Sequence, residues 1–98
     1  MEISNATVRV PFEVFGKVQK VFFRKFTQAQ AASLGIHGWC DNSSTGTVRG
    51  EIEGSRASVD QMKRWLSNEG SPKSTIDKCV FGTEVVSEKK YTTFGIRK

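Results

Sequence analysis

The chain has 98 residues, and 15 lysines and arginines against 10 aspartates and glutamates give a formal net charge of +5. This length suits one domain over residues 1–98 and excludes two separate hydrophobic cores, while an ordinary charged content of 26% argues against wholesale disorder. The positive net charge favours an anionic partner but does not distinguish among phosphate, nucleic acid and membrane headgroups.

After a loose polar segment at residues 1–6, the first predicted element is a strand over residues 7–15. Its alternating apolar side chains share one face: Val8, Val10, Phe12 and Val14. Pro11 has no N–H to donate, so it requires a strand edge, a bulge or a position whose N–H is unused. A loop at residues 16–20 follows.

Residues 21–34 are predicted to form a helix that stops at Gly35. The expected apolar stripe of this helix contains Phe22, Phe26, Ala29 and Ser33. We assign the neighbouring rings of Phe22, Phe23 and Phe26 to the core, because apolar stripes of helices usually pack there.

Residues 36–42 and 47–53 are predicted to pair as a β-hairpin across a turn at residues 43–46. Val48 and Ile52 share one face of the second strand. The hairpin therefore presents one apolar face to the core.

A second helix is expected next, with Ser58 and Gln61 at the spacing of a capping box and Gly70 at its end. Its apolar stripe consists of Val59, Met62 and Leu66, with Trp65 beside it. Residues 76–86 are predicted to form a fourth strand, and residues 91–96 a short fifth one.

The predicted order is β-α-β-β-α-β plus a short C-terminal strand. An α+β fold of the ferredoxin-like type accommodates this order, as a two-layer sandwich with two helices on one face of an antiparallel sheet. This fold hosts many functions, so the function must be argued from a site.

The first residues lack the basic and apolar regions of a signal peptide, and no apolar run approaches the ~20 residues of a membrane-spanning helix. Cys40 and Cys79 lack CxxC spacing, which favours two buried free thiols in a reducing compartment over a disulfide or a zinc site. We therefore expect a cytoplasmic protein without stable membrane association.

The segment from Gly16 to Arg24 reads as strand end, loop and helix start. Consecutive backbone N–H groups in such a loop can surround an anion, and the N-terminus of the helix adds partial positive charge. The guanidinium of Arg24 can hold two phosphate oxygens at once. Asn42 stands where a strand gives way to a turn, a place where asparagine commonly satisfies turn backbone.

Two spaced signatures resemble the acylphosphatase family. Residues 16–24 match its first signature, G-x-V-Q-G-V-x-F-R, except at Lys20, and residues 38–48 match its second, G-W-x-x-N-x-x-x-G-x-V, with Gly54 at a further glycine position. The resemblance also covers later segments, including residues 62–66, 70–72 and 94–97.

This resemblance implies a hydrolase that cleaves the carboxyl–phosphate bond of small acyl phosphates without metal or cofactor. It also implies that the product, inorganic phosphate, competes with the substrate for binding. Arg24 would grip the phosphate and Asn42 would orient the attacking water. The remaining substrate-binding residues would be Gly16, Lys17, Val18, Gln19, Lys20, Val21 and Phe22. A monomer that binds no nucleic acid is expected.

Two residues depart from the family pattern. Lys20 replaces a glycine, and would be strained if that position requires a positive φ, although its ammonium could also strengthen the anion field. Asp41 places a carboxylate next to Asn42, but adjacent strand residues point to opposite faces. A compensating Lys20–Asp41 ion pair is a further hypothesis.

Two alternatives remain at this level. RNA-recognition domains share the β-α-β-β-α-β order, and this chain is basic and contains aromatic residues. However, the strand at residues 47–53 carries no aromatic side chain on which bases could stack. The other alternative is a phosphate-binding relative of these enzymes whose catalytic activity is weakened by Lys20 or Asp41.

Overall fold

The computed structural model describes residues 6–86 and 89–97, so most of the predicted loose segment at residues 1–6 lies outside it. Ala6 is described, and its carbonyl accepts a hydrogen bond from the Arg56 N–H (3.2 Å). The elements in chain order are β1 (Thr7–Lys17), α1 (Phe23–Leu34), β2 (His37–Asn42), β3 (Val48–Ser55), α2 (Arg56–Asn68), β4 (Thr75–Phe81), β5 (Val85–Val86) and β6 (Phe94–Ile96).

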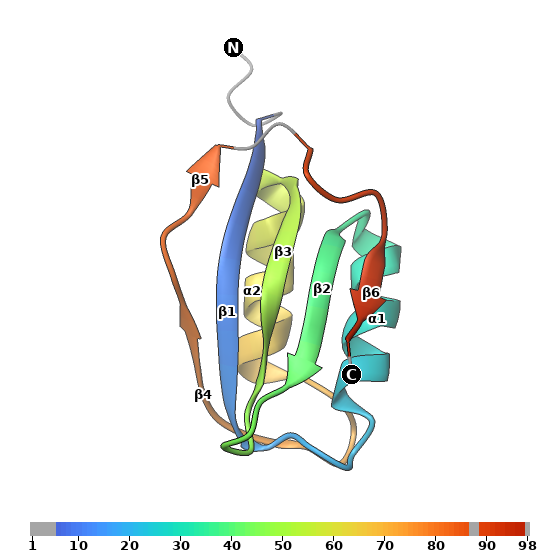
Figure 1. The fold of residues 1–98 in the computed structure, drawn as a ribbon, viewed down its shortest axis with the longest axis vertical. Coiled ribbons are helices and arrows are strands. Elements are labelled where there is room, and N and C mark those ends of the chain that lie inside the picture. Colours follow the sequence, from blue (N-terminus) through green and yellow to red (C-terminus); the bar gives the residue numbers. More distant parts are fainter. Residues whose placement is uncertain (1–5, 87–88, 98) are drawn as a thin grey trace.

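Six strands form one sheet in the order β4-β1-β3-β2-β6, with β5 also paired to β1. Both helices cover the same face of the sheet (Figure 1), which confirms the predicted ferredoxin-like sandwich. The expectation of a purely antiparallel sheet is wrong, because β6 pairs parallel to β2. β6 forms the edge of the sheet opposite β4 and runs in the same direction as its neighbour β2 (Figure 1).

Pro11 explains why the predicted fourth strand is divided. The ladder between β1 and β4 ends at Phe12 and Phe81, and the ladder between β1 and β5 resumes at Arg9 and Val85. Pro11 lies in this interruption and only accepts a hydrogen bond there, from the Gly82 N–H (2.9 Å). A residue without an N–H therefore fits inside a central strand.

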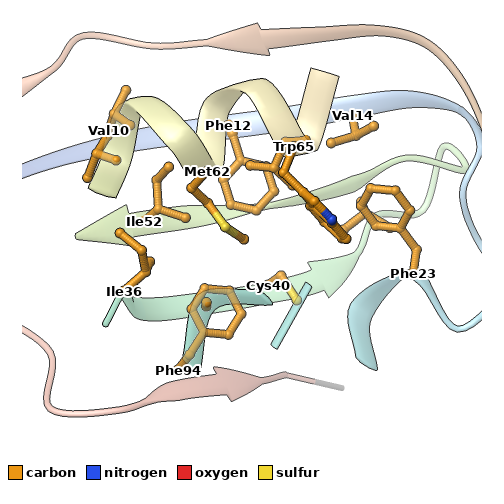
Figure 2. Packing of buried hydrophobic residues seen from close by; sticks show 14 of the residues in the cluster. Val10, Phe12, Val14, Phe23, Ile36, Cys40, Ile52, Met62, Trp65 and Phe94 are labelled. Carbon is orange, nitrogen blue, oxygen red and sulfur yellow. The ribbon is translucent and has the colours of Figure 1, made fainter. Parts of the chain in front are cut away.

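The core lies between the helices and the sheet (Figure 2). The alternation predicted for β1 is confirmed, since all four apolar side chains of its inner face are buried, and the predicted stripe of α2 is buried with Trp65. Each fully buried aliphatic or aromatic side chain contributes about 1.5–3 kcal/mol. The predicted hairpin is also confirmed, with Asn42 opposite Val48.

The predicted stripe of α1 is wrong. The helix begins at Phe23, and its buried residues are Phe23, Thr27 and Ala31. Phe22 and Phe26 are 72% and 41% exposed. The sequence contains two stripes with the same helical period, and packing selects the one whose Phe23 ring contacts Trp65, with ring centroids 5.7 Å apart.

The predicted capping box of α2 is also wrong. The helix starts directly after β3, and the Ser55 hydroxyl caps it by accepting the Ser58 N–H (3.2 Å). Gly35 and Gly70 do lie at the helix ends as predicted, each with a positive φ (70° and 65°).

Cys40 is buried as predicted, whereas Cys79 is only half-buried. Burial raises the pKa of both thiols to about 12, so both stay protonated at neutral pH. Neither helix in the described part of the chain has the length and apolar character that crossing a membrane requires.

Candidate active site

The loop predicted to bind phosphate joins the end of β1 to the start of α1, at the same end of the sheet as the β2–β3 turn (Figure 1). Gly16 and Lys17 are still part of β1, where they pair with Ile76 and Thr75 of β4 after a register shift at Gly16. The remaining residues, 18–22, form the loop itself.

Gly16 permits a close approach between β1 and β4. Its φ is 132°, and a Cβ atom there would lie 2.1 Å from the Thr75 carbonyl oxygen. No side chain can occupy that space, and the backbone conformation itself strains any residue other than glycine.

Gly16→Ala is therefore expected to lower the free energy of unfolding by about 2–3 kcal/mol, because a backbone shift must relieve the clash. Urea denaturation measures this loss. Gly95→Ala is the matched control, since a Cβ atom at Gly95 meets nothing within 4 Å. Equal stability of the two variants would contradict the packing argument.

Two residues of the loop have left-handed backbone conformations without being glycine. Lys20 has φ 63° and Phe22, the residue that precedes α1, has φ 59°. The position where the family signature has glycine thus has a positive φ, and the lysine there is strained. Strained residues of this kind are concentrated at functional sites.

Gln19 ties the loop to the β2–β3 turn. Its side-chain Nε2 donates to the carbonyls of Ser43 (3.0 Å) and Thr47 (2.9 Å). Since Asn42 is the last residue of β2, this bridge brings the end of β2 against the loop. The glutamine acts here as a structural clamp.

Arg24 and Asn42 line the same cavity, which has a volume of about 300 Å³. The other lining residues are Val18, Lys20, Phe22, Phe23, Lys25 and Ile96. Three cationic side chains therefore face one small cavity, and within the described ranges no carboxylate lines it. Such a cavity suits a compact anion.

Asn42 presents a free acceptor. Its Oδ1 is buried and has no hydrogen-bond partner among the residues that the structure describes. A buried carbonyl oxygen of this kind costs about 1–3 kcal/mol unless something donates to it, so a water or ligand donor is expected there. The position meets the requirement for holding a water molecule next to a bound anion.

Arg24 is held from the other end of the chain. Its Nη1 donates to the backbone carbonyl of Arg97 (3.3 Å), and the Arg97 N–H donates to the Cys40 carbonyl (2.8 Å). The Arg97 guanidinium in turn lies over the Trp39 ring, 4.2 Å from its centroid. These contacts attach the chain's last described residue to β2. Among the described residues, the Arg24 guanidinium donates no further hydrogen bond.

Not all predicted site residues line the cavity. Val18, Lys20, Phe22, Arg24 and Asn42 do so, whereas Gly16, Lys17, Gln19 and Val21 are not among the described residues that line it. Phe23, Lys25 and Ile96 were not predicted as site residues. Ile96 belongs to the segment at residues 94–97 that resembles the family, which was the available signal.

The hypothesis of a Lys20–Asp41 ion pair is wrong. Asp41 forms its ion pair with Arg49 on the neighbouring strand, with Oδ1 and Nε 2.9 Å apart, and no pair with Lys20 occurs within the described residues. Asp41 and Asn42 alternate along β2, and only Asn42 lines the cavity. The carboxylate is thus neutralised outside the site.

The donor set of the cavity does not suit a metal ion, because histidine, cysteine and carboxylate ligands are missing from its described lining. Elsewhere in the described ranges, no three such side chains converge. An anion remains the ligand that the lining favours.

Comparison with known proteins assigns this chain to a family. A family model described as Acylphosphatase matches residues 10–96. Acylphosphatase-1 of Homo sapiens is 46% identical over 99 residues, which cover 100% of both chains, and Acylphosphatase-2 of Homo sapiens is 43% identical over 98 residues, 99% of each. The solved structure of an acylphosphatase from Coxiella burnetii is similar with a TM-score of 0.85 and 34% identity, over 94% of each chain.

Proposed function

Since this chain belongs to the acylphosphatase family and hydrolyses small acyl phosphates, we propose that Arg24 binds the phosphoryl group and that Asn42 holds the attacking water. Lys20 and the N–H groups of the loop at residues 16–22 complete the seat for the phosphoryl oxygens. The single observation that carries this assignment is that Arg24 and Asn42 line one cavity.

In the proposed reaction the water oxygen attacks phosphorus while the bond from phosphorus to the bridging oxygen breaks. The electron pair of that bond stays with the carboxylate, and the water proton passes to an oxygen of the phosphoryl group. A carboxylate is a weakly basic leaving group and needs no proton donor. Positioning and charge stabilisation can therefore supply most of the catalysis.

The lining of the cavity supports this route, because it offers no general base. Its described residues include no histidine and no carboxylate, so the phosphoryl oxygens are the nearest proton acceptors. The cationic side chains stabilise the charge that develops on those oxygens in the transition state.

Release of phosphate from benzoyl phosphate, followed continuously, tests the proposal. We expect metal-independent hydrolysis that inorganic phosphate inhibits competitively, because product and substrate share the phosphoryl seat. Failure of phosphate to compete would contradict a shared seat at Arg24.

The RNA-binding alternative is not favoured. The family relationship points to an enzyme, and the outward side chains of β3 include Arg49 and Glu51 rather than aromatic rings.

We further propose that the enzyme acts as a cytoplasmic monomer without nucleic-acid or stable membrane partners. Cys40 and Cys79 are free thiols in the structure, which supports a reducing compartment.

Lys20→Gly is expected to separate stability from binding. Glycine adopts a positive φ without a Cβ penalty, so the free energy of unfolding should rise by about 1 kcal/mol. The same change removes one of three cations that line the cavity, so the Ki of inorganic phosphate should rise about two- to fivefold. Urea denaturation and inhibition kinetics measure the two effects.

Lys20→Met is the matched control, because it removes the charge but keeps a side chain at φ 63°. It should weaken phosphate binding without the gain in stability. If Lys20→Met binds phosphate as the original protein does, the ammonium has no part in the seat. If Lys20→Gly gains no stability, the left-handed backbone is not strained.

A further inference from the structure

The outer face of α1 carries an apolar stripe that the core does not use. Phe26 and Ala29 are three residues apart on one face of α1, and Phe22, which directly precedes the helix, lines the same hollow as they do. The two rings are exposed, Phe22 to 72% and Phe26 to 41%. Large aromatic side chains grouped in this way on a surface commonly mark a binding site.

The stripe lines a hollow of about 280 Å³ together with Lys25. Its surface is almost wholly apolar. Phe22 and Lys25 also line the cavity that contains Arg24 and Asn42. The apolar hollow therefore adjoins the proposed phosphoryl seat at the start of α1.

The backbone of Phe22 supports a role for this residue beyond the loop's shape. A bulky residue at φ 59° is strained, and glycine would fit that position without a Cβ penalty. The strained conformation holds an aromatic ring at the border between the two hollows, where it is mostly exposed. The fold thus retains an energetically costly ring at the place where the two hollows meet.

We propose that the apolar hollow binds the acyl group of the substrate, which makes acyl phosphates with an aryl or similarly large apolar acyl group the preferred substrates. The inference rests on the function proposed above. In an acyl phosphate one bridging oxygen separates phosphorus from the acyl carbon, so an acyl group must lie directly beside a phosphoryl group bound at Arg24. Phe22 directly precedes α1 and Phe26 lies in its first turn, four residues further on, which corresponds to a rise of about 6 Å along a helix axis, a span that a single aryl ring covers.

Contact with the stripe also affects the rate. Binding energy from the non-reacting part of a substrate helps to fix the reacting atoms in position. Acetyl phosphate, with one methyl group, covers little of the hollow, whereas benzoyl phosphate covers much more apolar surface. The ratio of kcat/KM for benzoyl phosphate to that for acetyl phosphate therefore measures the contribution of the hollow.

To test the proposal, this ratio is measured in the unaltered protein, in the variants Phe26→Ser and Phe26→Leu, and in the control variant Val86→Ser. Phe26 does not line the phosphoryl cavity, and its exposure makes the variants compatible with folding, which circular dichroism checks. Phe26→Ser is expected to lower the ratio about five- to tenfold, the loss that corresponds to about 1–1.4 kcal/mol of apolar contact. Phe26→Leu, which stays apolar, should keep more of the ratio. Val86→Ser, an exposed apolar-to-polar change on β5, should leave it unchanged.

The outcomes separate the two proposals. A ratio that Phe26→Ser leaves unchanged, while both substrates are hydrolysed, would overturn the acyl subsite and leave the assignment of Arg24 and Asn42 in place. Absence of phosphate release from both substrates in the unaltered protein would instead overturn the proposed function. An equal loss of the ratio in Val86→Ser would also overturn the subsite, since the effect would then not depend on the stripe.

Discussion

Replacement of Arg24 by alanine is expected to lower kcat/KM for benzoyl phosphate by about 10³-fold or more, with losses in both substrate affinity and turnover. Arg24 is one of three cations in the cavity, and it is the one whose planar donors match two phosphoryl oxygens at once. Its geometry is set by the hydrogen bond to the Arg97 carbonyl. Steady-state kinetics and the Ki of inorganic phosphate measure the effect.

Arg24→Lys and Arg64→Ala are the informative companions. Arg24→Lys keeps the positive charge but loses the two-pronged contact, so it should recover only a small part of the activity. Arg64 is an exposed residue of α2 that does not line the cavity, and its loss changes the net charge by the same amount as the loss of Arg24. If Arg64→Ala lost as much activity as Arg24→Ala, long-range charge rather than a phosphoryl contact would explain the result.

The parts of the fold that follow a single clear period were predictable. β1 alternates without ambiguity, and α2 has one apolar stripe, so both were placed with the correct face inward. α1 contains two candidate stripes, one through Phe22 and one through Phe23. Which of the two stripes is buried depends on the contact between Phe23 and Trp65 of the other helix, and the local sequence does not reveal this contact.

The parallel pairing of β6 was missed for a similar reason. β6 has three residues, too few to show a period, and its place beside β2 depends on contacts far apart in sequence. Gln28 donates to the Phe94 carbonyl (2.9 Å), and the Gly38 N–H donates to the Thr93 carbonyl (2.9 Å). Such tertiary contacts determine where a short strand joins a sheet.

The candidate site was predictable only through its signatures. Taken alone, Arg24 and Asn42 are an arginine after a loop and an asparagine in a turn, 18 positions apart in the chain. The bridge from Gln19 to the carbonyls of Ser43 and Thr47 links the two chain segments that carry them. A glutamine that binds backbone carbonyls leaves no periodic pattern, so the family resemblance predicted that the two residues converge, whereas their spacing could not.

The stripe of α1 through Phe22 and Phe26 is exposed, although apolar stripes of helices usually pack into the core. Phe22 and Phe26 were assigned to the core because helix stripes commonly pack there, yet the core already receives Phe23. An apolar stripe that the core leaves exposed beside a charged cavity requires a second explanation. The acyl subsite provides one that relates both faces of α1 to the same reaction, with the N-terminal turn at the phosphoryl group and the outer face at the acyl group.

Asn42→Ala is expected to reduce kcat by about 10²–10³-fold with a change in KM of no more than about threefold, because the amide is proposed to act on water and not on the phosphoryl group. Benzoyl phosphate kinetics measure the two parameters separately. Asn68→Ala, a change of the same type at an exposed position of α2, is the control and should leave both unchanged.

Stability distinguishes this role of Asn42 from a structural one. The buried Oδ1 has no partner within the described part of the chain, so its removal breaks no protein hydrogen bond there and eliminates a polar atom that is costly to bury. Asn42→Ala should therefore unfold in urea at the same or a higher concentration than the original protein while its kcat collapses. A destabilised variant that kept its kcat would mean that the amide supports the turn and does not hold the water.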